Sequence, residues 1–312
     1  MTERKIPLLC ITGPTASGKS ALAVRLAQLL GGEVVSCDSM QIYRGMDIGT
    51  AKPTEAEMCG VPHHMIDIVA PSEDYSCGRY ADEAAKVIKD IASRGALPIV
   101  CGGTGLYLDS LITATEHADS PSDPAMREEL LARDAQSLHD ELSEIDAESA
   151  AAIHPNNKRR VARAIEIYRI TGRTKSEWDR RSHDTPSPYD ASVVALGYLD
   201  RELLYRRIRM RVDEMFDRGL CDEVCSLDLD PDSTAAAAIG YKEVGTYRRG
   251  ECTEEQAREA VKLATTRYAK RQLSWLRGRS YVKWAMICAD PEQDKKMPDK
   301  IVNISLILSE RR

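Results

Sequence analysis

Apolar and polar positions along the first third of the chain repeat with two different periods. Continuous apolar runs, which are typical of buried strands, occupy residues 7–12, 32–37, 65–69 and 98–101. Apolar residues at helical spacing cover 21–30 and 80–93 and begin again near Thr104. This alternation predicts a parallel sheet with helices on both of its faces. Ligands of such sheets bind where the strands end, so the residues that follow each run are the candidates for chemistry.

The pattern changes between residues 113 and 190. Two helical stretches fill this segment, the first rich in acidic and the second in basic residues, and prolines mark both borders. We expect a helical insertion over 113–190 in an α/β core made of 1–112 and 191–312. The core resumes with a strand at 193–199 and helices at 201–219 and 253–277. The pattern leaves open the place of the apolar run near the end of the chain.

A glycine-rich motif, GPTASGKS, lies between the first predicted strand and the first predicted helix. A phosphate-binding loop of the form GxxxxGK[ST] requires this context, because its backbone N–H groups and the helix N-terminus then face an anion. Lys19 would supply charge to the phosphates, and Ser20 a hydroxyl ligand to Mg²⁺. The predicted diphosphate- or nucleotide-binding residues are Gly13, Pro14, Thr15, Ala16, Ser17, Gly18, Lys19 and Ser20.

The carboxylate that usually completes a nucleotide-hydrolysing site is not evident. The strand at 98–101 ends in GGTG, and Asp67 lies within an apolar run rather than after one. Hydrolysis of a nucleotide therefore has little support. Asp38 follows the second strand, where it is either a general base or a residue that forms a turn or caps a helix. Thr104 either binds a phosphate or bridging oxygen or caps its helix.

Composition and charge narrow the class of protein. The 312 residues carry a formal net charge of −6, so any attraction to nucleic acid must come from local patches. Nine cysteines without a CxxC pair predict reduced thiols, and Cys221 and Cys225 are expected to be buried. His63 and His64 lack further metal ligands at suitable spacing, which favours structural roles. Without a signal peptide or an apolar run of transmembrane length, we expect a cytoplasmic protein.

Basic residues gather in two helical segments. Between Lys158 and Arg181, nine basic residues stand against three acidic residues. The second segment interleaves cations with aromatic residues, namely Arg267, Tyr268, Lys270, Arg271, Trp275, Arg277, Arg279 and Tyr281. Such interleaving suits phosphate contact and base stacking, although charge counts alone favour a solvated helix face.

Seven ordered segments together resemble the bacterial tRNA dimethylallyltransferase family, whose members modify the adenosine next to the anticodon. The segments, which run from the glycine-rich loop to Arg277, are GPTASGKS, DSMQIYRGMDIGTAKP, GVPHHMIDI, GGTGLYL, RRVARAIEIYRITG, IGYKE and TTRYAKRQLSWLRG. Small departures occur at RAIE and LSWLR, where the family often has RALE and xTWFR.

The resemblance implies a P-loop NTPase-like core, a Mg²⁺ cofactor and a prenyl transfer. Dimethylallyl diphosphate would donate its five-carbon unit to N6 of adenosine 37 in the tRNA anticodon stem-loop. Diphosphate is then a leaving group, so no water needs activation. By resemblance Asp38 is the general base, and Thr104 and Arg211 are catalytic because they stabilise the charge on the departing diphosphate. Because an allylic carbon with cationic character must be kept from water, we expect an enclosed channel through the core. We also expect a monomer that binds no membrane. The residues matched to tRNA contact are Asp38, Ser39, Met40, Gln41, Thr104, Arg127, Arg159, Arg160, Val161, Ala162, Arg163, Ala237, Ala238, Ile239, Gly240, Tyr241 and Lys242.

Three other functions remain open. A P-loop small-molecule kinase would transfer a phosphoryl group from ATP. An adenylate isopentenyltransferase would prenylate a free nucleotide, but a mononucleotide gives the basic insertion nothing to hold. A tRNA-binding module without catalysis would not need the intact Lys19, Ser20, Asp38 and Thr104.

Overall fold

The computed structural model describes residues 5–113, 123–184 and 186–287, and these form two compact units. The first unit comprises residues 1–75, 83–108 and 189–312 as far as they are described. The second comprises residues 76–82 and 109–188, again within the described ranges.

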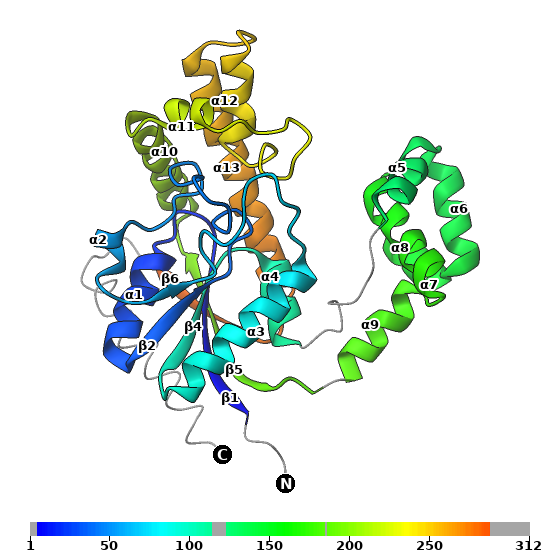
Figure 1. Ribbon diagram of the computed structural model, residues 1–312, viewed down its shortest axis with the longest axis horizontal. Helices are drawn as coiled ribbons and strands as arrows, with labels where there is room; N and C mark the ends of the chain where they lie inside the picture. The colour runs from blue at the N-terminus through cyan, green and yellow to red at the C-terminus, as the bar shows by residue number, and fades with distance from the viewer. Residues whose placement is uncertain (1–4, 114–122, 185, 288–312) are drawn as a thin grey trace. The chain divides into compact units, whose positions relative to one another are not determined.

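A six-stranded parallel sheet forms the centre of the first unit (Figure 1). Its order is β3-β2-β4-β1-β5-β6. The strands are β1 (Ile6–Thr12), β2 (Gly32–Ser36), β3 (His63–His64), β4 (Leu97–Gly102), β5 (Tyr189–Tyr198) and β6 (Val282–Ile287). Because β1 lies between β4 and β5, its residues are buried on both faces and the loop that follows it opens at the middle of the sheet. The predicted α/β fold class is confirmed.

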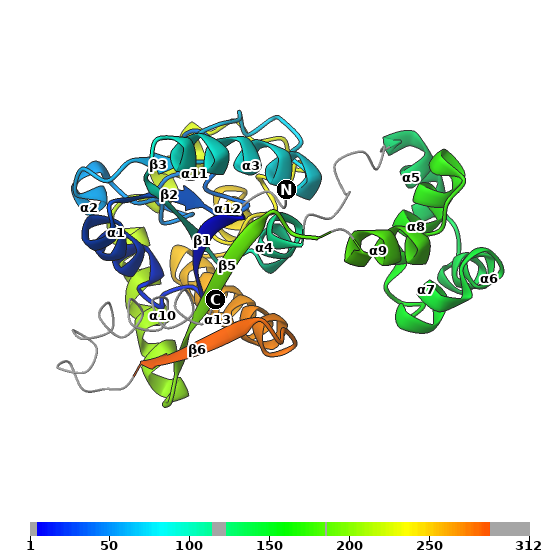
Figure 2. The same ribbon diagram turned by 90° about the horizontal axis from the view of Figure 1, so that it is seen from below.

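The helices of the first unit fall into two groups. Helix α1 (Lys19–Leu30) buries Leu22, Val24 and Leu26 against the sheet, and α2 (Glu55–Met58) follows in the chain. Helices α3 (Cys77–Ser93) and α4 (Gly105–Ile112) have residues in both units. Helices α10 (Arg201–Asp217), α11 (Leu220–Ser226), α12 (Tyr241–Arg248) and α13 (Glu254–Arg277) pack on one another, and α10 also packs against β5 (Figure 2).

The second unit is helical, as the pattern predicts. It contains α5 (Pro124–Ala132), α6 (Ala135–Ile145), α7 (Ala147–Ala152), α8 (Lys158–Thr171) and α9 (Lys175–Asp184). Asp123, Asp134 and Asp146 cap the first three of these helices by accepting hydrogen bonds from backbone N–H groups. Leucine and isoleucine side chains from α5, α6 and α8 form its core, which includes Leu130, Leu138, Leu142 and Ile165.

Residues 65–69 do not form the predicted strand. Met65 and Asp67 have positive φ angles of 60° and 55°, which lie outside the range of extended backbone. The short β3 precedes them, and Val69 pairs only with Tyr43 in an isolated bridge. The run is apolar because Met65 and Val69 are buried beneath a loop, not because the backbone is extended.

Strand β6 was not predicted as an element. It extends the sheet beyond β5 with Val282 opposite Val193, although its own residues alternate only weakly between buried and exposed positions. Residues 301–308, the apolar run whose place the pattern leaves open, lie outside the described residues.

Candidate active site

The loop between β1 and α1 has the geometry of an anion cradle. Gly13 cannot be replaced, because a Cβ atom there would lie 2.9 Å from the carbonyl oxygen of Leu196. Ala16 and Gly18 have φ angles of 61° and 83°, which turn the chain so that α1 begins at Lys19. The free N–H groups of the first helical turn thus open towards the loop.

Three side chains hold this loop from outside. Arg207 Nε and the Tyr198 hydroxyl both donate to the carbonyl oxygen of Ala16, at 2.9 and 3.2 Å. Arg211 Nη1 donates to Thr15 Oγ1 at 3.4 Å. These bonds fix the left-handed conformation at Ala16, which costs about 1–2 kcal/mol for a residue with a side chain.

Ser17 gives the cradle an unused donor. Its side chain is only 3% exposed, and its Oγ atom has no hydrogen-bond partner among the described residues. A buried hydroxyl without a partner costs about 1–3 kcal/mol. An anion bound in the loop would satisfy it.

Lys19, Arg211 and Asp38 lie close enough to affect one another's charge, and Arg207 adds a further cation beside Arg211. Burial lowers the pKa of Lys19 and the pKa of Arg211 from their ordinary values, and the Asp38 carboxylate opposes both shifts. Because Lys19 and Arg211 repel each other, a polyanion bound between them would gain from both charges. The predicted P-loop residues and two of the predicted catalytic residues are therefore electrostatic neighbours.

Asp38 stands in the turn after β2. Its Oδ1 atom accepts a hydrogen bond from the backbone N–H of Met40 at 3.0 Å, which is the turn-forming arrangement. Its second oxygen receives no hydrogen bond from the described residues. The turn role is thus present, and it leaves one carboxylate oxygen free to accept a proton.

Thr104 joins the turns that follow β2 and β4. Its Oγ1 atom accepts from the backbone N–H of Ser39 at 3.0 Å, and its own N–H donates to the carbonyl oxygen of Cys37 at 3.2 Å. Tyr268 of α13 lies beside the same group, and burial raises its pKa, an effect that the nearby Asp38 increases. The residue predicted for base stacking is therefore placed beside the predicted catalytic group.

The side chain at the end of β4 that reaches Ser20 is a thiol. Cys101 lies beside Ser20, and burial raises the pKa of Cys101 to about 11, so it stays protonated and neutral. In nucleotide hydrolases a carboxylate beside the loop holds Mg²⁺ with this hydroxyl. Asp67, the nearest substitute in the sequence, instead forms an ion pair with Lys52.

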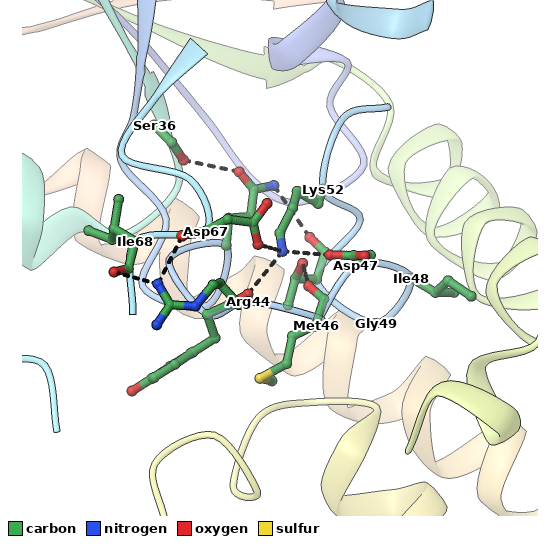
Figure 3. A network of polar contacts seen from close by, with 12 residues as sticks. Ser36, Arg44, Met46, Asp47, Ile48, Gly49, Lys52, Asp67 and Ile68 are labelled. Carbon is green, nitrogen blue, oxygen red and sulfur yellow. Dashed lines mark hydrogen bonds and ion pairs between the residues drawn. The ribbon is translucent and has the colours of Figure 1, made fainter. Parts of the chain in front are cut away.

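A polar network shapes the loop between β2 and β3 (Figure 3). The Lys52 side chain is 6% exposed, and its ammonium group donates to the carbonyl oxygen of Tyr43 at 2.9 Å and to the carboxylates of Asp47 and Asp67. Arg44 donates to the carbonyl oxygen of Ile68 at 3.0 Å. Because a buried ammonium needs such partners, this network fixes the loop that carries Asp38.

Gln41, a predicted tRNA contact, is part of the same loop structure. Its Oε1 accepts from Ser36 Oγ at 3.0 Å, and its Nε2 lies 3.4 and 3.3 Å from the carbonyl oxygens of Thr50 and Ala51. In this structure both ends of the amide are thus used within the protein.

Sequence analysis did not find Glu223 of α11. Its carboxylate accepts from the backbone N–H groups of Asp47, Ile48 and Gly49 at 3.0, 2.7 and 3.0 Å, and from the Tyr241 hydroxyl. Gly49 has no room for a side chain, because a Cβ atom would lie 2.4 Å from the Tyr241 ring. The segment IGYKE, which contains Tyr241, was singled out only as part of the family resemblance.

The predicted tRNA contacts at 237–242 differ in exposure. Ala238, Gly240 and Tyr241 are buried, whereas Ala237 and Lys242 are exposed and Ile239 is half-buried. A contact through this segment would therefore use its exposed positions or its backbone.

The predicted tRNA contacts in the second unit also differ in exposure. Val161 and Ala162 are fully buried in its core. Arg127 and Arg163 form ion pairs with Glu166, which has no exposed surface. Arg159 and Arg160 are exposed on α8 and remain the predicted contacts with tRNA.

The histidines have the structural roles that the sequence predicts. His63 Nδ1 lies 2.8 Å from the carbonyl oxygen of Val61, and His64 Nε2 lies 2.7 Å from Glu33 Oε2. Within the described ranges, no three His, Cys, Asp or Glu side chains are placed to hold a metal. The prediction for Cys221 and Cys225 was wrong: Cys221 is half-buried and Cys225 is exposed, although both are free thiols. None of the described helices is long and apolar enough to cross a membrane.

Comparison with known proteins places this arrangement in a family. The family model described as IPP transferase matches residues 41–279, and that described as isopentenyl transferase matches residues 6–70. A tRNA dimethylallyltransferase of Halalkalibacterium halodurans is 48% identical over 300 residues, which cover 94% of this chain and 95% of that protein. This chain belongs to the tRNA dimethylallyltransferase (IPP transferase) family.

Solved structures of this family share the fold. The full-length tRNA isopentenylpyrophosphate transferase of Bacillus halodurans has a TM-score of 0.73 at 43% identity, covering 98% of this chain and 99% of that chain. A eukaryotic dimethylallyltransferase acting on tRNA has a TM-score of 0.83 at 30% identity, covering 98% of this chain and 80% of that chain. The predicted P-loop NTPase-like fold and the resemblance to the tRNA dimethylallyltransferases are confirmed.

Proposed function

We propose that this protein transfers the dimethylallyl group of dimethylallyl diphosphate to N6 of adenosine 37 in tRNA and releases diphosphate. Family membership supports the reaction class. The assignment to these residues rests on the closeness of Asp38 to the anion cradle. The charge of Asp38 acts on both Lys19 and Arg211.

The cradle would hold the diphosphate as a leaving group. Lys19, Arg211 and the unpartnered Ser17 hydroxyl would stabilise the negative charge that develops on oxygen as the carbon–oxygen bond breaks. No water molecule has to be activated in this reaction. The neutral Cys101 beside Ser20 is compatible with such a reaction, because a protonated thiol cannot act as a general base at neutral pH.

Asp38 would accept the proton of the attacking amine. The lone pair of N6 is delocalised into the adenine ring, so the amine needs a proton acceptor and a closely held electrophile. Thr104 would hold the Ser39 backbone next to Asp38, so that the carboxylate stays within reach of the attacking N6. The predicted channel that excludes water stays a prediction.

Mg²⁺ fits the cradle as a partner of the diphosphate. Ser20 offers a hydroxyl oxygen at the start of α1, and Mg²⁺ in such sites takes most other ligands from phosphate oxygens and water. When bound, the ion would neutralise part of the charge on the leaving group. The Cys101 thiol is a poor ligand for this hard cation.

The tRNA would bind through exposed cations. Arg159 and Arg160 on α8 are available for phosphate contacts. The target adenosine must leave its stack, which is least costly in a single-stranded loop such as the anticodon loop. Action as a monomer in the cytoplasm stays a prediction from the sequence.

Nucleoside analysis tests the proposal. Purified protein is incubated with unmodified tRNA, labelled dimethylallyl diphosphate and Mg²⁺, without ATP. We expect N6-dimethylallyladenosine in the digested tRNA. Label in free AMP but not in tRNA would support an adenylate isopentenyltransferase instead, and a product formed only with ATP would support a kinase.

A further inference from the structure

The side chain of Gln272 connects two backbone turns at the candidate active site. It lies in the last third of α13 and is only 6% exposed. Its Oε1 atom accepts from the backbone N–H of Thr15 at 2.9 Å, and its Nε2 atom donates to the carbonyl oxygen of Gly103 at 2.9 Å. The two partners fix the orientation of the amide, because one is a donor and the other an acceptor.

The fit around this amide is close. A Cβ atom at Gly103 would lie 2.1 Å from Gln272 Nε2 and 3.3 Å from the carbonyl oxygen of Gly13. Only glycine at position 103 lets the turn after β4 approach the amide and the P-loop together. The carboxamide of Gln272 lies between the two turns and therefore fixes the distance between them.

Each of the two turns carries one half of the proposed chemistry. Thr15 belongs to the loop that holds the anion, and its hydroxyl accepts a hydrogen bond from Arg211. Gly103 precedes Thr104, whose hydroxyl binds the backbone N–H of Ser39 next to Asp38. A shift of either turn would change the distance between the leaving group and the proton acceptor.

We propose that Gln272 is a positioning residue that sets the spacing between the diphosphate cradle and the Asp38–Thr104 side of the site. This inference rests on the proposed function. A neutral amide is the side chain suited to the task, since it donates and accepts at once and adds no charge beside a dianion or trianion. A carboxylate there would accept from Thr15 but would face the carbonyl oxygen of Gly103 without a proton.

The substitution Gln272→Glu tests this role, because it changes one donor and the charge but not the shape. At pH 8 we expect kcat/KM for the donor to fall by about 10²-fold, as for a small misplacement of reacting groups. As the pH falls, the variant's activity relative to the parent protein should rise. A protonated carboxyl group can again donate to Gly103 and accept from Thr15.

Gln256→Glu is the matched control on the same helix. Gln256 accepts from the backbone N–H of Thr253 in a capping box, which a glutamate side chain also forms. We expect this control to keep parental activity at every pH. A Gln272→Glu protein that melts at the parental temperature and works within twofold of the parent at pH 8 would overturn the proposal. So would a loss of activity that shows no recovery at lower pH.

A binding measurement separates this inference from the proposed function. In Gln272→Asn the side chain is one methylene shorter and cannot reach both turns. We expect its affinity for inorganic diphosphate, measured by calorimetry, to fall at least about tenfold while its affinity for tRNA is unchanged. Unchanged diphosphate affinity would overturn the role of Gln272, whether or not the parent protein prenylates tRNA. If the parent binds diphosphate but transfers no prenyl group, the proposed function fails and the calorimetric comparison still decides the role of Gln272.

Discussion

At the scale of single residues, the site brings Asp38 close to the cations Lys19 and Arg211, with Arg207 as a further cation beside Arg211. Lys19 and Arg211 repel each other, and Asp38 offsets part of that repulsion. The cations therefore favour binding of a polyanion, because a diphosphate would offset their mutual repulsion with its negative charge. It also gives Asp38 two possible contributions, one to the turn after β2 and one to the reaction.

The substitution Asp38→Asn separates these contributions. The amide oxygen of asparagine can still accept from the Met40 N–H, so the turn is kept, but the side chain cannot take a proton. We expect turnover to fall by about 10²-fold or more, with tRNA affinity close to that of the parent. Asp228→Asn, which changes an exposed carboxylate after α11, is the control. Unchanged turnover in single-turnover assays would remove Asp38 from the role of base.

At the scale of elements, the loop that carries Asp38 is fixed by contacts with distant helices. Glu223 of α11 accepts hydrogen bonds from three successive backbone N–H groups of residues 47–49. Lys52 forms ion pairs with the carboxylates of Asp47 and Asp67. Helix α13 adds Gln272 and Tyr268. The turn that carries Asp38 thus depends on helices from the last third of the chain.

Glu223→Gln should loosen this loop. A carboxamide has one acceptor oxygen and places an NH₂ group against backbone donors, so the free energy of unfolding should fall by about 1–3 kcal/mol. Hydrogen exchange at residues 47–49 should become faster. Glu251→Gln, which removes an exposed ion pair with Arg249, is the control and should leave both measurements unchanged. Parental exchange rates in Glu223→Gln would contradict the proposed support of the loop.

A second contact between elements should appear in the pH dependence of stability. Hydrogen bonds from Arg94, and then from His64, lower the pKa of Glu33 in β2 to about 2 from an ordinary 4.5. A lowered carboxyl pKa stabilises the fold above the unfolded value and loses that stabilisation as pH falls from about 4.5 towards 2. After allowance for the partly exposed Arg94, we expect about 1–2 kcal/mol. Glu33→Gln should flatten the stability curve in this range, and an unchanged slope would contradict the assignment.

A feature could be predicted from the sequence when the residues that cause it lie close together in the chain. The loop at 13–20 and the elements on either side of it were predicted because strand, turn and helix signals are adjacent in the chain. The strand predicted at 65–69 was wrong, because Met65 and Val69 are buried in a segment whose backbone has positive φ angles and is not extended. Gln272 was missed because its partners lie 257 and 169 residues away.

At the scale of the whole molecule, a mildly acidic protein is proposed to bind a polyanion through a few exposed cations. The formal net charge is −6, yet Arg159 and Arg160 are exposed on one helix of the second unit. Their neighbours Val161 and Ala162 form the core of that unit, so the helix has one structural face and one face for binding.

Charge reversal tests the binding face. Arg159→Glu with Arg160→Glu should weaken tRNA binding and lower the slope of log affinity against log salt by about 1–2. The double change Lys86→Glu with Lys89→Glu on α3 alters the net charge equally at exposed positions of the first unit. It should leave the salt slope unchanged. Equal effects of the two variants would show that total charge, rather than this helix face, governs binding.

The most direct measurement counts diphosphate against prenylated adenosine. Protein, Mg²⁺, tRNA and dimethylallyl diphosphate are mixed without any nucleoside triphosphate, and both products are quantified during the reaction. If the loop at 13–20 holds a leaving group, one diphosphate is released for each prenylated adenosine. A parallel mixture with added nucleoside triphosphate that forms orthophosphate, while the adenosine of the tRNA stays unmodified, would contradict it.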